Sequence, residues 1–437
     1  MPNKRIASIV SGFVAIALVS LACGLSVPSG LPSEDAIATR VAETMTAMPQ
    51  PTADPQTQPT LPVATDTPSE PVPATQVPAP AALGVAFRGG DGNVYYWSEA
   101  MSSPLMVSNT GDVERALISP DGQQILLLKT SDYYTFSLEI VRADGTGLRT
   151  LVSTAGFDAL PREAGSIAAA PYQVTWLADS RNILFTTNSL FEGPGLVVGE
   201  NIYKLDSFTG DLSVFLVIED QFRLMYYLSP DQTKIAVSHP EGINLYNMDG
   251  SLIRKKVIEY PFVNTASEYA WVSAPVWSPD SNSLVAAVPP QDPWTENPMD
   301  STVWRISSDG SSSEKLFSTR MVFWPAIIAA ISPDHSKLLY LTRTGTTAAD
   351  RDVLQLTNID GSGTIEYASG NILDLPSWST DGSKFYFYDQ LLGAFIGQPG
   401  GSPIPVSGFS GVTDVTWVDE TRFIGAAGPE GGWRLLL

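Results

Sequence analysis

The stretch Ile118-Ser119-Pro120-Asp121-Gly122 closes one apolar run, and a second apolar run opens shortly after it at Ile125. The pattern returns along the chain at intervals of roughly 40 to 60 residues, a period typical of repeat architectures. The clear copies are Leu228-Ser229-Pro230-Asp231, Trp277-Ser278-Pro279-Asp280 and Ile331-Ser332-Pro333-Asp334, and the weaker ones are Trp176-Leu177-Ala178-Asp179, Trp378-Ser379-Thr380-Asp381 and Trp417-Val418-Asp419-Glu420.

A second turn signal lies about midway between successive copies. Pairs of Asp and Gly, or of two glycines, separate two further apolar runs there and supply the positive φ that tight hairpin turns need. In the first signal, Pro presets φ and Asp bonds the backbone two residues on. The midway pairs are Asp144-Gly145, Gly210-Asp211, Asp249-Gly250, Asp309-Gly310, Asp360-Gly361 and Gly400-Gly401.

Each unit therefore contains four antiparallel strands. Such units, repeated around an axis, are typical of a β-propeller. We predict an all-β fold over residues 83–437, a seven-bladed β-propeller of four-stranded antiparallel blades, with six or eight blades as alternatives. Six units are complete between about 113 and 411. We expect the seventh to combine strands from 412–437 and 84–108, because a closed ring leaves no sheet edge.

The start of the chain indicates secretion. Lys4 and Arg5 precede an apolar run that reaches Ala22, and the run is short for a membrane span. The sequence Leu21-Ala22-Cys23-Gly24 resembles the lipobox of bacterial lipoproteins, although Ser20 stands where that family usually has Leu. The resemblance implies that residues 1–22 are removed and that Cys23 is lipidated. The alternative is an ordinary signal peptide followed by an incidental cysteine.

Between this anchor and the propeller we expect a tether. Residues 23–48 form the lipidated N-terminus and a short helix, and residues 49–82 form a disordered stalk. The stalk segment contains ten prolines and many threonines but no glycine, aromatic residue, Lys or Arg. Such a composition cannot bury a core and favours extended polyproline II. A proline-rich ligand for a partner domain is the alternative.

The charge balance bears on the choice of partner. The chain carries 25 basic and 46 acidic side chains, for a net charge of −21. Such a surface repels phosphate backbones, so we expect no nucleic acid as a partner. The partners that we predict are a membrane through the lipid anchor and a protein or peptide, with a glycan as the alternative. The predicted location is extracytoplasmic, on the cell surface or the periplasmic side of a bacterial membrane.

The repeats resemble those of the TolB-like, WD-related propellers of bacterial envelope proteins, over essentially the whole of 83–437. The resemblance implies a propeller that binds proteins. The same repeats also form the gating propeller of prolyl oligopeptidase-type enzymes, which need a C-terminal hydrolase domain. The chain ends at Leu437 directly after its last repeat, so we expect no such domain here.

The long connections between strands should emerge together on one face of the propeller. Loops on a rigid scaffold commonly carry function, and aromatic side chains provide contact area at low entropic cost. The alternative for each ring is packing on its own blade. Our candidate binding residues on this face are Phe157, Phe191, Tyr269, Trp271, Trp294, Phe323 and Trp324. The repeat tryptophans Trp176, Trp277, Trp378 and Trp417 should instead pack between blades.

Familiar catalytic patterns are absent from the sequence. We find no Gly-x-Ser-x-Gly, His-Glu-x-x-His or phosphate-binding glycine loop, and only His239 and His335 as histidines. We therefore predict a binding module without enzymatic activity, catalytic residues, metal or cofactor. Two alternatives stay open: a lectin for envelope polysaccharide, and a hydrolase or lyase with carboxylates from different blades at the mouth of the central channel.

Overall fold

The computed structural model describes most of the chain beyond residue 82, all of it within the compact unit Val77–Leu437. The segments predicted as signal peptide (1–22), lipidated N-terminus (23–48) and stalk (49–82) lie outside the described residues. The described ranges are 83–132, 134–192, 198–218, 224–266, 269–291, 298–323, 328–344, 351–372, 375–409, 411–412, 415–427 and 434–436.

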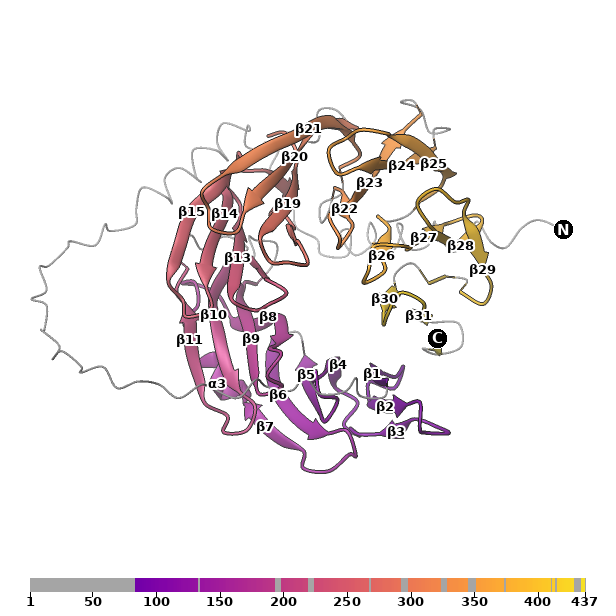
Figure 1. Ribbon diagram of the computed structural model, residues 1–437. Coiled ribbons are helices and arrows are strands. Elements are labelled where there is room, and N and C mark those ends of the chain that lie inside the picture. Colours follow the sequence, from indigo (N-terminus) through magenta and orange to yellow (C-terminus); the bar gives the residue numbers. More distant parts are fainter. Residues whose placement is uncertain are drawn as a thin grey trace, which may run out of the picture. The chain divides into compact units, whose positions relative to one another are not determined.

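Six antiparallel sheets of four strands follow one another around a ring (Figure 1). They are β4(Val113–Ile118), β5(Gln124–Asp132), β6(Thr135–Arg142), β7(Arg149–Val152); β8(Ala168–Trp176), β9(Asn182–Leu190), β10(Val198–Asp206), β11(Leu212–Leu216); β12(Met225–Leu228), β13(Lys234–His239), β14(Gly242–Asn247), β15(Leu252–Glu259); β18(Val276–Trp277), β19(Ser283–Val288), β20(Met299–Ser307), β21(Ser313–Met321); β22(Ala330–Ile331), β23(Lys337–Arg343), β24(Asp352–Asn358), β25(Ile365–Gly370); and β26(Ser377–Trp378), β27(Phe385–Asp389), β28(Gly393–Gly397), β29(Ile404–Val406). The predicted fold class, an all-β propeller with four-stranded antiparallel blades, is confirmed.

The two ends of the propeller form a three-stranded sheet each. The sheets are β1(Gly84–Arg88), β2(Val94–Ser98), β3(Leu105–Met106) and β30(Val415–Trp417), β31(Phe423–Ala427), β32(Arg434–Leu436). Within the described strands no backbone pairing joins these two sheets, and the composite seventh blade stays a prediction. The two sheets meet through an ion pair between Arg422 and Glu99.

Two small elements lie in the connections between blades. Helix α3(Thr154–Asp158) follows β7, with Ser153 as its N-cap accepting a hydrogen bond from the Gly156 amide. Strands β16(Asn264–Ala266) and β17(Tyr269–Ala270) pair between β15 and β18. No helix in the described part of the chain combines the length and the apolar character that crossing a membrane requires.

The repeated Ser-Pro-Asp motif forms a self-contained turn. In the copy at Ser229, the serine hydroxyl donates to Asp231 Oδ1 at 2.6 Å, and the Thr233 amide donates to the same carboxylate at 3.0 Å. The residue after the aspartate, Gln232, has a positive φ of 52°. The Ser-to-Asp bond recurs at 2.6 to 2.7 Å in four other copies, those at Ser119, Ser278, Ser332 and Ser379.

Tryptophans of the repeat link neighbouring blades, as predicted. Each Nε1 donates to a carbonyl on the first strand of the preceding blade at 2.9 to 3.0 Å: Trp176 to Leu117, Trp277 to Tyr227, Trp378 to Ala330 and Trp417 to Ser377. Where Ile331 replaces the tryptophan, His335 Nε2 lies 2.9 Å from the carbonyl of Val276 instead. His335 thus provides a second kind of hydrogen bond between neighbouring blades.

The hydrophobic core lies between blades. The second strand of a blade is covered on both faces, so its residues are apolar in succession rather than in alternation; Ile125, Leu126 and Leu127 of β5 are fully buried. Side chains of β5 and β6 pack against Trp176 and Phe185 of the next blade. The innermost strands β8, β12, β18, β22 and β26 therefore surround the propeller axis on a rigid support.

Candidate functional site

The propeller has two faces of different construction. Strands alternate in direction, so the turns from first to second strand and from third to fourth strand lie on one face, here called the turn face. The connections from second to third strand and from blade to blade lie on the other face, here called the loop face. Connections on the turn face are short throughout the four-stranded blades, whereas the loop face carries α3, β16 and β17.

Three of the seven predicted binding residues are buried. Phe157 packs edge-on against Phe185 with ring centroids 6.0 Å apart, and Trp271 packs against Tyr260 at 5.3 Å. Phe157, Trp271 and Phe323 expose at most 3% of their surface. The prediction that these three rings present themselves to a partner is therefore wrong. The reason is that the connections fold back onto the blades and use large rings to seal the ends of the core.

The other predicted residues are placed less completely. Phe191 is half-buried at the end of β9. Tyr269 belongs to β17, and its side chain is not described. Trp294, Trp324 and the predicted lipidation site Cys23 lie outside the described residues.

A different set of apolar side chains is exposed on the loop face. Their exposed fractions range from 37% for Phe262 to 76% for Leu391. Sequence reasoning missed the four aliphatic members because it favoured aromatic residues, and it missed the two aromatic ones because no local signal separates an exposed apolar side chain from a buried one. The set is Tyr134, Ile167, Val217, Phe262, Leu391 and Leu392.

Leu391 and Leu392 stand at the tip of a firmly held turn. The buried carboxylate of Asp389 accepts hydrogen bonds from the amides of both leucines and of Asn371, each at 2.8 Å. Gly370 packs so closely that an added Cβ would lie 1.9 Å from Asp389 Oδ2. Hydrogen bonds to a buried charged group are strong. The turn therefore presents two adjacent leucines to solvent on a rigid support.

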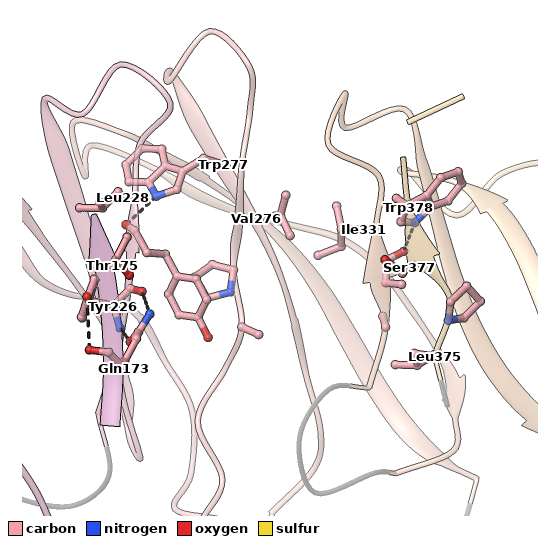
Figure 2. A pocket seen from close by; sticks show the side chains of 16 residues that line it. Gln173, Thr175, Tyr226, Leu228, Val276, Trp277, Ile331, Leu375, Ser377 and Trp378 are labelled. Atoms are coloured by element: carbon pink, nitrogen blue, oxygen red, sulfur yellow. Dashed lines mark hydrogen bonds between the residues drawn. The ribbon is translucent and has the colours of Figure 1, made fainter. Parts of the chain in front are cut away.

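A central pocket of about 660 Å³ lies among the innermost strands (Figure 2). Side chains from β8, β12, β18, β22 and β26 and the residues just before them line it. The sixteen lining residues that the structure describes contain no Asp, Glu, Lys, Arg or His. The alternative with catalytic carboxylates at the channel mouth is therefore not supported by any described residue of this wall.

Most hydrogen-bonding groups in the wall are already engaged. The Gln173 amide donates to the Tyr226 carbonyl at 2.6 Å and accepts from the Tyr226 amide at 2.8 Å. The carbonyls of Tyr227 and Ala330 accept from the repeat tryptophans. The pocket is thus aromatic and apolar, with a few polar groups at fixed places.

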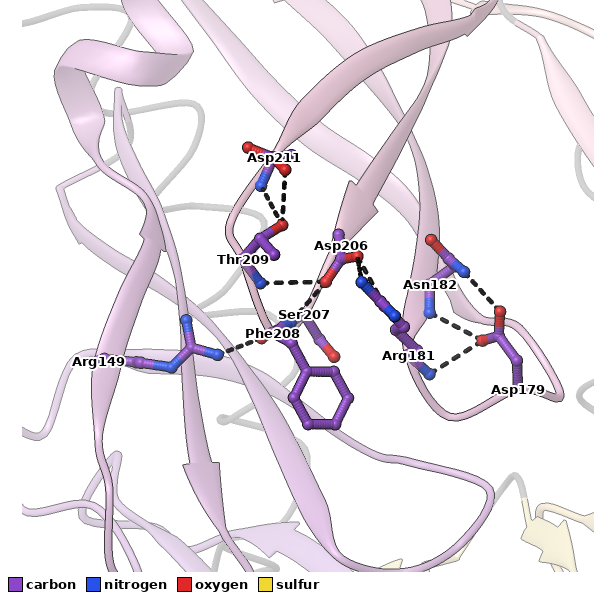
Figure 3. A network of polar contacts seen from close by, with 9 residues as sticks. All are labelled: Arg149, Asp179, Arg181, Asn182, Asp206, Ser207, Phe208, Thr209 and Asp211. Atoms are coloured by element: carbon purple, nitrogen blue, oxygen red, sulfur yellow. Dashed lines mark hydrogen bonds and ion pairs between the residues drawn. The ribbon is translucent and has the colours of Figure 1, made fainter.

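The turn face is polar, and its charges serve the fold. Figure 3 shows Asp206 in an ion pair with Arg181 at 2.7 Å and accepting from the amides of Phe208 and Thr209. These bonds, above all that from Arg181, lower the pKa of Asp206 from 3.8 to about 2. Arg149 donates to the carbonyl of Ser207 and so joins this turn to the preceding blade.

The repeat aspartates are engaged in the same way. The hydroxyl of Ser229 and the amide of Thr233 lower the pKa of Asp231 to about 2, and equivalent bonds do the same for Asp280. No group of three or more His, Cys, Asp or Glu suited to a metal ion occurs among the described residues. These carboxylates therefore act as turn clamps.

Comparison with known proteins addresses the fold. No family model and no curated protein matches the sequence. Among solved structures, TolB from Acinetobacter baumannii is 16% identical with a TM-score of 0.33, over 64% of this chain and 61% of that chain. Oligogalacturonate lyase from Vibrio parahaemolyticus is 13% identical with a TM-score of 0.47, over 70% and 83%. Saccharomyces cerevisiae Sqt1 is 14% identical with a TM-score of 0.49, over 82% and 92%.

At these identities and TM-scores the comparisons establish neither a family nor a function, and the assignment as a β-propeller depends on the described sheets. The prediction that the chain is not an enzyme has to be corrected. The similar structures include a lyase, a puromycin hydrolase and prolyl endopeptidases, so membership in this fold does not exclude an activity. The prediction treated missing sequence motifs as an exclusion, but side chains from different blades can meet without any fixed spacing.

Proposed function

We propose that this protein is an extracytoplasmic, protein-binding propeller, anchored to a membrane through Cys23, whose loop face contacts the partner. The observation that supports this proposal best is the Leu391–Leu392 turn. Two adjacent leucines that are 76% and 72% exposed carry a solvation cost that burial against a partner would remove. Because Asp389 already holds the turn, docking costs little further ordering.

The path of the chain supports the choice of the loop face. The Glu99 amide donates to the Leu83 carbonyl at 3.3 Å, and Glu99 pairs with Arg422 in a turn between β30 and β31. Leu83 is therefore on the turn face. The first described residue of the propeller thus lies on the face opposite to the proposed binding surface.

A capture experiment with the full-length protein tests this proposal. The double variant Leu391→Ser/Leu392→Ser should reduce recovery of the protein partner from envelope extract at least tenfold. The matched control is Phe208→Ser, which removes a ring that is 61% exposed on the turn face. Equal loss in both variants, or no loss in the double variant, would contradict a binding surface on the loop face. A glycan array on the same samples addresses the predicted alternative of a polysaccharide ligand.

A further inference from the structure

A second concave site lies on the turn face, between the first two four-stranded blades. Its volume is about 510 Å³, within the usual range for ligand sites. The wall comes from the turns between β4 and β5 and between β6 and β7, and from Phe208 in the turn between β10 and β11. The segments that build this turn-face groove, 119–132, 134–149 and 201–212, all lie within the described residues.

The groove is built on a rigid support. Val141, which lines it, exposes only 1% of its surface. The amide of Asp121 donates to the Ser180 hydroxyl at 2.9 Å, and Arg149 donates to the carbonyl of Ser207, so the two blades beside the groove are bonded to each other. A site that is already held in place loses little conformational entropy when a ligand binds.

Side chains in the groove offer hydrogen-bond donors and acceptors next to each other. The Arg142 guanidinium makes no hydrogen bond or ion pair with a described residue. Asp121 and Asp144 use Oδ1 for bonds within their own turns, and neither Oδ2 accepts a hydrogen bond from a described residue. The hydroxyl of Thr146 lowers the pKa of Asp144, so this carboxylate stays ionised and remains an acceptor.

Phe208 adds an apolar surface to this polar wall. Its ring is 61% exposed, and Figure 3 shows it between Arg149 and Arg181. The Arg181 guanidinium lies 5.8 Å from the centroid of the ring, a cation–π contact that holds the ring in place. An exposed ring beside guanidinium and carboxylate groups suits a ligand that combines an apolar face with several hydroxyl groups.

A carbohydrate has this combination of groups. Each sugar hydroxyl both donates and accepts, so it can donate to the carboxylate of Asp121 or Asp144 and accept from a guanidinium at the same time. The C–H groups on one face of a pyranose ring carry a partial positive charge, which complements the negative face of an aromatic ring such as Phe208. The groove therefore provides both kinds of contact that a sugar ring makes.

The charges of the groove favour a neutral carbohydrate over an acidic one. Arg142 and Arg149 are balanced within the wall by Asp121 and Asp144, while the whole chain carries a net charge of −21. An acidic polymer would find no net attraction in the groove and would be repelled by the rest of the surface. We infer that the turn-face groove binds an uncharged polysaccharide, with one sugar ring packed on Phe208. This second site does not depend on the proposed protein binding by the loop face.

Oligosaccharide binding to the full-length protein tests the inference. The probes are neutral hexasaccharides of glucose, mannose and N-acetylglucosamine, and a hexasaccharide of glucuronic acid is their charged counterpart. Isothermal titration calorimetry measures the affinities, in a detergent whose headgroup is not a sugar. We expect saturable binding of at least one neutral probe and at least tenfold weaker binding of the acidic probe.

Two variants locate the binding. Phe208→Ser and Arg142→Ala should each weaken binding of the neutral probe at least tenfold, and because both side chains are exposed, the unfolding midpoint should stay the same. The matched control is Arg254→Ala on the outer strand β15, where an exposed arginine is removed far from the groove in sequence and the affinity should not change. Phe208→Ser remains the control for partner capture, because the partner binds the opposite face.

Three outcomes would overturn the inference. They are the absence of binding by every neutral probe, an acidic probe that binds as tightly as the neutral ones, and wild-type affinity in folded Phe208→Ser and Arg142→Ala. If the neutral probe binds as expected but partner capture ignores Leu391 and Leu392, the proposed function fails and the carbohydrate site stands. If capture depends on the two leucines and no neutral probe binds, the reverse holds.

Discussion

The turn face and the loop face of this propeller are built on opposite principles. On the turn face, one short turn recurs from blade to blade, with a serine hydroxyl and a backbone amide donating to the aspartate in five copies. On the loop face the connections differ from one another. Asp132 and Asp389 each accept two amides of their own turn, but Asp389 is buried and also accepts from the Asn371 amide, whereas Asp132 is exposed. Repetition indicates a role in building the ring, whereas the individual connections are where one such protein differs from another.

The repeat tryptophans pack and hydrogen-bond between neighbouring blades, beneath both faces. Removing one of them should have the largest effect on stability. Trp378→Ala deletes a ring that packs on Phe385 at 5.0 Å and the bond to the Ala330 carbonyl. Truncating a buried tryptophan costs about 4 kcal/mol. Urea unfolding measures the loss, and Trp304→Ala, a half-buried ring on β20, should lose less than half as much. Equal losses of stability in the two variants would mean that the repeat tryptophan stabilises the propeller no more than a half-buried ring on another strand does.

The next largest effect should come from the clamp on the loop face. Asp389→Ala removes the acceptor of three backbone amides at a buried site, and leaving such groups unsatisfied costs about 3 kcal/mol. The matched change on the turn face is Asp309→Ala, where the exposed carboxylate accepts from the Ser311 amide and water replaces it. Calorimetric unfolding should therefore show a clearly smaller loss for Asp309→Ala. The reverse order would contradict our description of the Leu391–Leu392 turn as rigidly held.

The sequence predicts the turn face well and the loop face poorly, for a physical reason. The Ser-Pro-Asp turn is local: Ser278, Asp280 and the amide of Asn282 satisfy one another within five residues. Burial on the loop face depends on contacts between distant segments, as when Trp271 packs on Tyr260. Aromatic residues there were predicted to be exposed because their chemistry suits binding, but the same apolar surface suits the core.

The pocket could not be predicted from the sequence either. Thr175, Val276 and Ser377 are separated by about a hundred residues each and meet only because the blades close around an axis. The closing sheets illustrate the same limit, because counting strands at the two ends left open whether they would share one sheet. In both cases the missing information is the geometry of packing between blades.

A smaller and reversible effect should appear on acidification, through the clamps on the turn face. The pKa values of Asp206, Asp231 and Asp280 are lowered to about 2 in the folded protein, against the usual 3.8. The folded protein therefore holds these protons less tightly than the unfolded chain. Their contribution to stability is complete above about pH 4 and is lost as the pH falls toward 2. The urea midpoint should therefore stay constant from pH 6 to about pH 4 and decrease between pH 4 and pH 2, and the decrease should be smaller in Asp231→Asn. A midpoint independent of pH would contradict the role of the clamps.

The smallest effect should come from the ion pair that joins the two terminal sheets on the turn face. Arg422 is held by Asp419 as well as by Glu99, so Glu99→Gln removes one of two acidic partners at an exposed site. Solvent and side-chain entropy offset most of such an attraction. We expect a slight decrease of the urea midpoint in dilute buffer that disappears in 1 M salt, where the Debye length is about 3 Å. Glu99 makes no described contact with the Leu391–Leu392 turn or with the residues of the central pocket. Partner capture should therefore not change. A large loss of stability that does not depend on salt would mean that ring closure depends on this single contact. The turn face would then also rely on a contact that is not repeated from blade to blade.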